Sequence, residues 1–394
     1  MTVGWHEQAL LAGRRQALAC MALAPWAASA QATPRSGDAS AVLRVGPGHA
    51  LRTPAAAAAV ATDGAVVEIE AGTYPGDAAV WLQDRLTLRA VGGRVSLPAA
   101  GRAAEGKATW VLRGGHFDIE GIDFSGSRVS ARNGAGIRLE RGQARVRSCR
   151  FIDNQNGILT SNFADVELDV LHCEFGHNGH GDGQSHNLYA GSIGRLRVQG
   201  SWFHHAREGH LIKSRAAHTE VRYSLLADGD GGQASYELEF PSGGVAIVVG
   251  NLIEQAPTTR NPHLVSYGVE GYGERANRLV LAHNSLFDRR PGGIFLRVAP
   301  GEVEVQCVNN LLLGTGAAGP WLGDEAQGNY RISAGDLQAD ARGEPRLRPR
   351  AYARGRAMPL SADLRPMRQY RHAAQTVPLA RAPRDPGAFQ AQRG

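Results

Sequence analysis

The chain has 394 residues, which is ample for one large domain or two ordinary ones. It holds 50 glycines and 6% aromatic residues, a composition that suits a fold of many short strands and turns. Its formal net charge of +6 comes from interspersed charges without a basic run, which fits attraction to a polyanion but argues against a nucleic-acid-binding protein.

The N-terminus has the features of an export signal, which we expect to span residues 1–32. Arg14 and Arg15 precede an apolar stretch at 17–28, and the Ala-Gln-Ala sequence at 30–32 forms a cleavage site. The paired arginines resemble those of a twin-arginine signal. No later segment reaches the apolar length that spans a bilayer. The sequence therefore predicts a periplasmic or secreted protein with no membrane span.

From about residue 117 the chain repeats a short pattern with a period of roughly 23 to 33 residues. Each copy alternates apolar and polar residues, then has a small residue or an asparagine, then a large apolar residue. Copies occur at 117–124, 146–151, 170–175, 198–203, 221–226, 248–253, 282–287 and 308–312. Period-two alternation predicts strands buried on one face, and units this short must stack to bury it. The pattern favours a parallel β-helix over a β-propeller, whose blades need four strands per about 40 to 50 residues.

Three cysteines follow the predicted signal: Cys149, Cys173 and Cys307. An odd number argues against a disulfide framework. Cys149 and Cys173 lie one repeat apart, where their Cβ vectors would run parallel and strain a bond between them. We therefore expect buried thiols.

Several segments resemble proteins of the pectate-lyase-like superfamily of right-handed parallel β-helices. They are the opening at 45–48, the alanine-rich run at 54–61, residues 71–74 and the ending at 385–389. The resemblance implies an all-β, right-handed parallel β-helix over 33–335 with an N-terminal capping helix. We expect residues 336–394 to form an extended segment packed on the last coils, with a disordered tail as the alternative.

A second strand of each coil carries the candidate site. Aligning 187–190, 211–215 and 237–240 puts Tyr189, Lys213 and Glu239 in one outward column, with neighbours ~4.8 Å apart. Arg215 shares the face of Lys213 because residues i and i+2 of a strand point the same way. A one-residue slip would turn Lys213 inward, where an unpaired lysine is costly. An outward ladder of Lys213 and Glu239 without catalysis is the structural alternative.

The string Lys213-Ser214 resembles the lysine-serine pair of the alginate lyase and chondroitinase B family, in which the lysine is the general base. That family has a catalytic arginine about one coil later, where this chain has none at 232–236. β-Elimination needs a partner for the uronate carboxylate, a base for the C5 proton and an acid for O4. We expect Lys213 to be the base, Arg215 the carboxylate partner, and Tyr189 or His210 the acid.

Eight of the fourteen histidines lie between 172 and 218. The glycine-rich loop 177–186 is expected to present polar groups to a sugar, and the turn 204–207 to shape the same groove. The expected substrate-binding residues are His186, Asn187, His205, Arg207, Glu237 and Glu239. A metal bound through His177, His180, Asp182 and His186 is the alternative use of the loop, but its spacing is not that of a closed zinc site, and we predict none.

The function predicted from these features is a polysaccharide lyase acting on an acidic, uronate-containing polysaccharide, as a monomer. One alternative is a glycoside hydrolase of the polygalacturonase type, with Glu237 and Glu239 as its two carboxylates. Another is a carbohydrate-binding or structural β-helix without catalysis. No cofactor is expected, although Asp228 and Asp230 could hold calcium in place of forming a plain turn.

Overall fold

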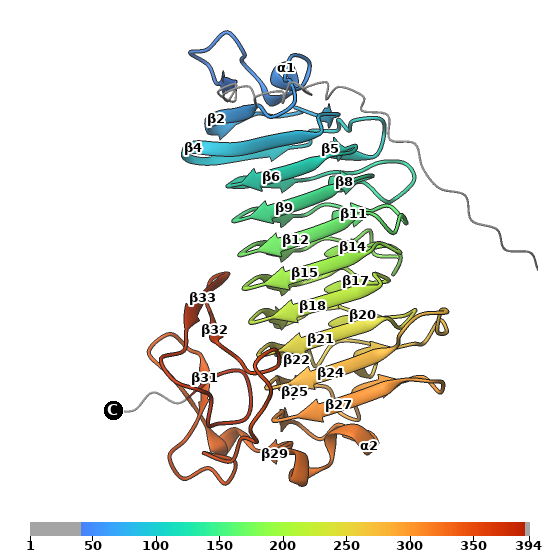
Figure 1. The fold of residues 1–394 in the computed structure, drawn as a ribbon, viewed down its shortest axis with the longest axis vertical. Helices are drawn as coiled ribbons and strands as arrows, with labels where there is room; N and C mark the ends of the chain where they lie inside the picture. The colour runs from blue at the N-terminus through green and yellow to red at the C-terminus, as the bar shows by residue number, and fades with distance from the viewer. Residues whose placement is uncertain (1–40, 391–394) are drawn as a thin grey trace, which may run out of the picture. The chain divides into compact units, whose positions relative to one another are not determined.

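The structure is a computed structural model that describes residues 41–390, so the predicted signal at 1–32 lies outside the described residues. Within 41–390 the strands form a 20-stranded and a 9-stranded parallel sheet and two small antiparallel pairs. Most coils contribute three strands, and each strand pairs with its equivalent in the next coil (Figure 1). This is the parallel β-solenoid that the repeats predicted.

The 20-stranded sheet bends into two faces, which share the long strand β4. Face 1 contains β1 (Val42–Val45), β2 (Val66–Thr73), β4 (Arg85–Pro98), β6 (His116–Glu120), β9 (Gln143–Arg147), β12 (Glu167–Leu171), β15 (Arg195–Gln199), β18 (His218–Arg222), β21 (Val245–Val249), β24 (Arg278–Ala282) and β27 (Glu304–Val308). Face 2 contains β7 (Ile122–Ser125), β10 (Arg150–Ile152), β13 (Glu174–Gly176), β16 (Trp202–His204), β19 (Leu225–Ala227), β22 (Leu252–Gln255), β25 (Ser285–Asp288), β28 (Leu311–Leu313) and β29 (Tyr330–Ile332).

Face 3 is the nine-stranded sheet of the described chain. It contains β3 (Ala79–Trp81), β5 (Ala108–Leu112), β8 (Ala135–Leu139), β11 (Asn156–Thr160), β14 (Leu188–Ala190), β17 (Ile212–Ser214), β20 (Leu238–Phe240), β23 (His263–Tyr267) and β26 (Ile294–Val298). The inward residues of the three faces meet in one core, in which the rings of Phe124, Phe151, Phe175 and Phe203 stack from coil to coil with centroids 4.6–5.1 Å apart. Such stacking buries the apolar face that no single coil could bury alone.

The corner between faces 1 and 2 explains the column of small and amide residues in the repeats. One residue there adopts a left-handed conformation, for example His283 with φ of 52°, and the next residue turns its side chain into the corner. The Asn284 side chain accepts a hydrogen bond from the Asn251 backbone N–H at 3.0 Å and donates one to the Val248 carbonyl at 2.9 Å. The earlier coils place Cys149 and Cys173 in this column as free, buried thiols.

Replacing Asn284 with alanine is expected to lower the free energy of unfolding by about 2–4 kcal/mol, because it leaves the buried N–H of Asn251 and carbonyl of Val248 unpaired. Denaturant unfolding measures this change. The exposed Asn133 offers a matched control, whose alanine variant should unfold like the parent. Equal stability of the two variants would contradict a stabilising role for the corner column.

The alanine-rich run forms only the five-residue helix α1 (Pro54–Ala58), so the structure has no substantial capping helix there. Alanine favours helix, but a segment this short gains few helical hydrogen bonds and depends on packing. At the other end lie the short helices α2 (Gly319–Leu322), η1 (Glu325–Gln327) and η2 (Ala334–Asp336). Within 41–390 no helix is long and apolar enough to cross a membrane.

The C-terminal segment runs back along the outside of the coils (Figure 1). It forms two antiparallel pairs, β30 (Leu337–Ala339) with β31 (Pro345–Leu347) and β32 (Arg368–Arg371) with β33 (Gln375–Pro378). Backbone N–H groups of Met358, Met367 and Ala388 donate to the side chains of Asn309, Tyr223 and Ser285 on the coils. These bonds attach the segment to the outer side of the corner and to face 2.

Candidate functional site

The outward column of face 3 has the register predicted by aligning the successive coils of the chain with one another. Tyr189 on β14 pairs with Lys213 on β17, which pairs with Glu239 on β20. Ile212 and Ser214 on either side of Lys213 are buried, so the lysine projects from the outer surface of the sheet, with its side chain 14% exposed. The structure therefore places a largely buried lysine side chain between a tyrosine and a carboxylate.

Lys213 and Arg215 form a cationic pair that binds carboxylates. The Lys213 Nζ lies 3.4 Å from both Glu239 Oε2 and Glu270 Oε1. The Arg215 guanidinium donates to both oxygens of Glu270, from Nε to Oε2 at 3.0 Å and from Nη2 to Oε1 at 2.7 Å, and also donates to the Tyr189 hydroxyl. This two-pronged geometry is the one in which arginine recognises a carboxylate most strongly.

Glu270 was not among the residues that the sequence indicated. It lies in the turn after β23, 55 residues beyond Arg215, and this turn shows no strand alternation. Partial burial alone would raise the pKa of Glu270, but the hydrogen bond from Arg215 and the charges of Lys213 and Arg215 outweigh it and hold that pKa below its usual value. Glu270 is thus an ionised carboxylate on the cationic pair.

Two histidines pack beneath the column. The His210 Nε2 lies 2.9 Å from Glu239 Oε2, while the His186 Nδ1 accepts the backbone N–H of His210 at 3.0 Å. The His186 ring also packs perpendicular to the Tyr189 ring, with centroids 5.2 Å apart. Burial, followed by the charges of His210, Lys213 and Arg215, lowers the pKa of His186 well below its usual value, so this ring is neutral.

Glu239 is held as a carboxylate by its partners. Burial would raise its pKa, but the hydrogen bond from His210 and the charges of His210 and Lys213 lower it below the usual value. The column therefore combines a lysine amine, an arginine, a tyrosine hydroxyl and two ionised carboxylates, each in contact with at least one of the others. His186 and His210 are only 2% and 6% exposed, so they support the column from below and do not face solvent.

Four of the six residues expected to bind the sugar are instead buried: His186 and Glu239, described above, and Glu237 and Asn187. Glu237 has no exposed surface, and neither of its carboxylate oxygens has a hydrogen-bond partner in another described residue. Asn187 is equally buried, and its amide nitrogen donates to the His204 carbonyl at 2.9 Å. These two residues were expected to point outward by the alternation of a strand, but each lies one residue before its strand begins, Asn187 before β14 and Glu237 before β20. Since the i, i+2 rule holds only within a strand, it does not place these side chains outward.

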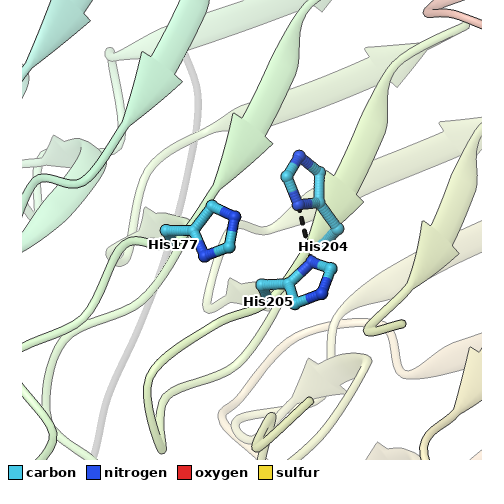
Figure 2. A group of neighbouring side chains, drawn as sticks. All are labelled: His177, His204 and His205. Atoms are coloured by element: carbon cyan, nitrogen blue, oxygen red, sulfur yellow. Dashed lines mark hydrogen bonds between the residues drawn. The ribbon is translucent and has the colours of Figure 1, made fainter. Parts of the chain in front are cut away.

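His205 and Arg207 lie at the turn after β16, where they contact a different set of residues. The His205 Nδ1 lies 2.9 Å from His204 Nδ1, and Arg207 pairs with Asp153 at 2.5 Å. His177, from the turn one coil earlier, stacks on His205 with ring centroids 4.7 Å apart. The three histidines 177, 204 and 205 are drawn in Figure 2. This group joins histidines that the sequence did not place together.

The segment proposed as a calcium alternative is used to build a turn. Asp228 is fully buried, and its two carboxylate oxygens accept the backbone N–H groups of Ala206 and Ala234 at 3.0 and 2.7 Å. Burial raises the pKa of Asp228 to about 6. Asp230 is exposed and pairs with Arg289 at 3.0 Å. The two carboxylates therefore serve separate structural contacts.

The fold is shared with solved structures of other proteins. No protein-family model and no curated protein matches the chain. Among solved structures, the pectate lyase Pel9A is similar with a TM-score of 0.60 and 12% identity, over 90% of this chain and 98% of that one. The PL6 family alginate lyase AlyGC is matched with a TM-score of 0.33 and 12% identity, over 79% of this chain and 56% of that one. The match to Pel9A shows that the chain has a parallel β-helix fold of the pectate-lyase-like type.

Proposed function

We propose that the chain is a polysaccharide lyase that cleaves an acidic, uronate-containing polysaccharide by β-elimination. The observation that carries the proposal is the Arg215 guanidinium, which holds a carboxylate in two-pronged geometry beside the Lys213 amine and the Tyr189 hydroxyl. The fold, which is shared with a pectate lyase, supports a carbohydrate substrate. Export to the periplasm or beyond, where such polymers occur, is part of the proposal.

The reaction assigns one role to each group of the column. Arg215 binds the uronate carboxylate and stabilises the negative charge that develops there when C5 loses its proton. The Lys213 Nζ, in its unprotonated amine form, takes the C5 proton, the C4–O4 bond breaks, a double bond forms between C4 and C5, and O4 receives a proton. Tyr189 is the better donor to O4 because its hydroxyl lies on the outer surface beside Arg215, whereas His210 is engaged with Glu239.

Glu270 occupies the position that the substrate carboxylate would take. Its side chain is 43% exposed and lies on a turn, so it can leave Arg215 when a uronate arrives. Its departure would also remove one of the two carboxylates on Lys213, leaving Glu239 and His210 to position the amine. Glu270 then acts as an internal competitor of the substrate.

Changing Glu270 to glutamine is expected to lower KM for the polysaccharide about 2- to 5-fold with a smaller change in kcat, since such a half-exposed ion pair contributes about 0.2–1 kcal/mol. Steady-state kinetics measures both constants. The exposed Glu274 on the same turn provides the control, and its glutamine variant should keep the parent KM. A higher KM in Glu270→Gln would mean that Glu270 helps to bind substrate.

The substrate class is tested with a panel of alginate, pectate, glycosaminoglycans and bacterial exopolysaccharides. At least one uronate polymer should be cleaved, and its carboxyl-reduced form should not, because the reduced sugar offers Arg215 no anion and has a less acidic C5 proton. Cleavage of the reduced form at the same rate would overturn the role of Arg215. A hydrolase with Glu237 and Glu239 as its pair is disfavoured, because Glu237 has no exposed surface.

A further inference from the structure

Three imidazoles from two adjacent coils converge at the end of face 2, where β13 and β16 run into their turns (Figure 2). His177 is exposed, His205 is half-buried and His204 is buried. One ring nitrogen of each lies within 4.8 Å of those of the other two, and the Nδ1 atoms of His204 and His205 are 2.9 Å apart. Nitrogens at this spacing are close to the geometry of a shared metal ion.

Tetrahedral zinc binds imidazole nitrogen at about 2.0–2.1 Å, which puts neighbouring ligand atoms about 3.3 Å apart. The His204–His205 separation therefore needs to widen by only a few tenths of an ångström. His177 needs the larger movement, and it is the exposed ring on a turn. The group can thus close around an ion without a change in the coil backbone.

The rings of His204 and His205 lie next to the kinds of group that usually support metal-bound histidines. The His204 Nε2 lies 3.5 Å from the Glu174 carboxylate, which Arg150 also holds at 2.7 Å. The His205 ring makes a hydrogen bond to the backbone of Asp230. A carboxylate or carbonyl behind the ring fixes the orientation of the imidazole and directs its other nitrogen toward the metal.

The coil is shaped to admit the His204 ring. A Cβ atom on Gly176, the register partner of His204, would lie 2.1 Å from the ring carbon Cε1, so only glycine leaves room for it. Trp202 packs against the same ring with centroids 4.1 Å apart. Arg207, the nearby cation, is neutralised by its ion pair with Asp153. The ring is therefore held in one orientation, facing the other two histidines.

We propose that His177, His204 and His205 bind a divalent transition-metal ion of the Zn²⁺ class, a site independent of the cationic pair on face 3. Three imidazoles suit Zn²⁺, Cu²⁺ or Ni²⁺ better than Ca²⁺ or Mg²⁺, which prefer oxygen ligands. With three protein ligands, a fourth coordination position stays open for water or another ligand. The ion links two successive coils.

Isothermal titration of the full chain, prepared without a histidine tag, with ZnCl₂ alone tests the site. One Zn²⁺ per chain is expected to bind. His177→Ala and His204→Ala should each weaken binding at least about 10-fold, and Glu174→Gln, which removes only the supporting charge, by about 10- to 100-fold. Titration with Co²⁺ gives an independent readout, because its visible absorption reports tetrahedral nitrogen coordination.

The control is His180→Ala, an exposed histidine in the same region but outside the group of three, which should bind Zn²⁺ as the parent does. Circular dichroism of the metal-free variants checks their folding. If His204→Ala fails to fold, His177→Ala decides, because its ring lies on an exposed turn. Parent-like binding by His177→Ala, loss of binding in His180→Ala, or no Zn²⁺ bound to the parent would each overturn the proposal.

Discussion

Lys213→Ala is expected to lower kcat/KM for the uronate polymer by about 10²- to 10⁴-fold, the contribution of a positioned general base. The variant should fold normally because the Lys213 side chain projects from the outer surface of face 3, while its neighbours Ile212 and Ser214 fill the interior. Initial rates of bond cleavage measure the effect, and thermal unfolding verifies the fold.

Lys107, the other of the two lysines in the chain, provides a matched control. Lys107 pairs with Glu105 and Glu140 at 3.0 and 2.7 Å, and Lys107→Ala should keep parent activity. Lys213→Arg separates the base from the charge, since arginine keeps the cation but does not release its proton. Activity retained in Lys213→Arg would make Lys213 an electrostatic partner of Glu239, and activity retained in Lys213→Ala would remove it from the mechanism.

Glu237→Gln is expected to change how stability depends on pH. Burial, and then the nearby carboxyls of Asp228 and Asp288, raise the pKa of Glu237 well above its ordinary value of 4.5. The folded chain therefore binds a proton that the unfolded chain releases once the pH exceeds about 4.5. The contribution of this group to the free energy of unfolding is fully present below that pH and is lost as the pH rises toward the raised pKa.

Above pH 4.5 the free energy of unfolding of the parent should fall, relative to that of Glu237→Gln, by up to about 1.4 kcal/mol per pH unit. This is the slope expected when unfolding releases one proton. Guanidinium unfolding from pH 4 to 8 measures the difference between the two proteins. The exposed Glu302 serves as control, and Glu302→Gln should follow the parent at every pH. Parallel stability profiles for Glu237→Gln and the parent would show that the Glu237 carboxyl is not held protonated by the fold.

Much of the architecture could be predicted because a solenoid depends on contacts between equivalent residues one coil apart. The alternation in segments such as 170–175 and 198–203 indicated the buried face. The column of Cys149, Ser201 and Asn284 indicated the corner, since only small or amide side chains fit there and pair with the backbone. The same coil-to-coil logic gave the register of Tyr189, Lys213 and Glu239.

Residues outside the strands could not be placed in this way. Glu237 and Asn187 lie just before their strands, where alternation no longer determines direction. Glu270 reaches the cationic pair from a turn with no repeat pattern, so only the three-dimensional structure shows it. The histidines were grouped by nearness in sequence, whereas Gly176 and His204 are partners one coil apart. Aligning the coils would have placed His177 and His205, which follow these partners, at equivalent positions one coil apart.

Elimination at the Lys213 and Arg215 pair is expected to produce two kinds of chain end in equal number, and counting both distinguishes it from hydrolysis. Uronate polymers incubated with the protein are assayed for new reducing ends and for near-ultraviolet absorbance of the C4–C5 double bond. The proposal predicts one unsaturated end for each new reducing end. New reducing ends without that absorbance would mean that the chain hydrolyses the polymer and would rule out β-elimination.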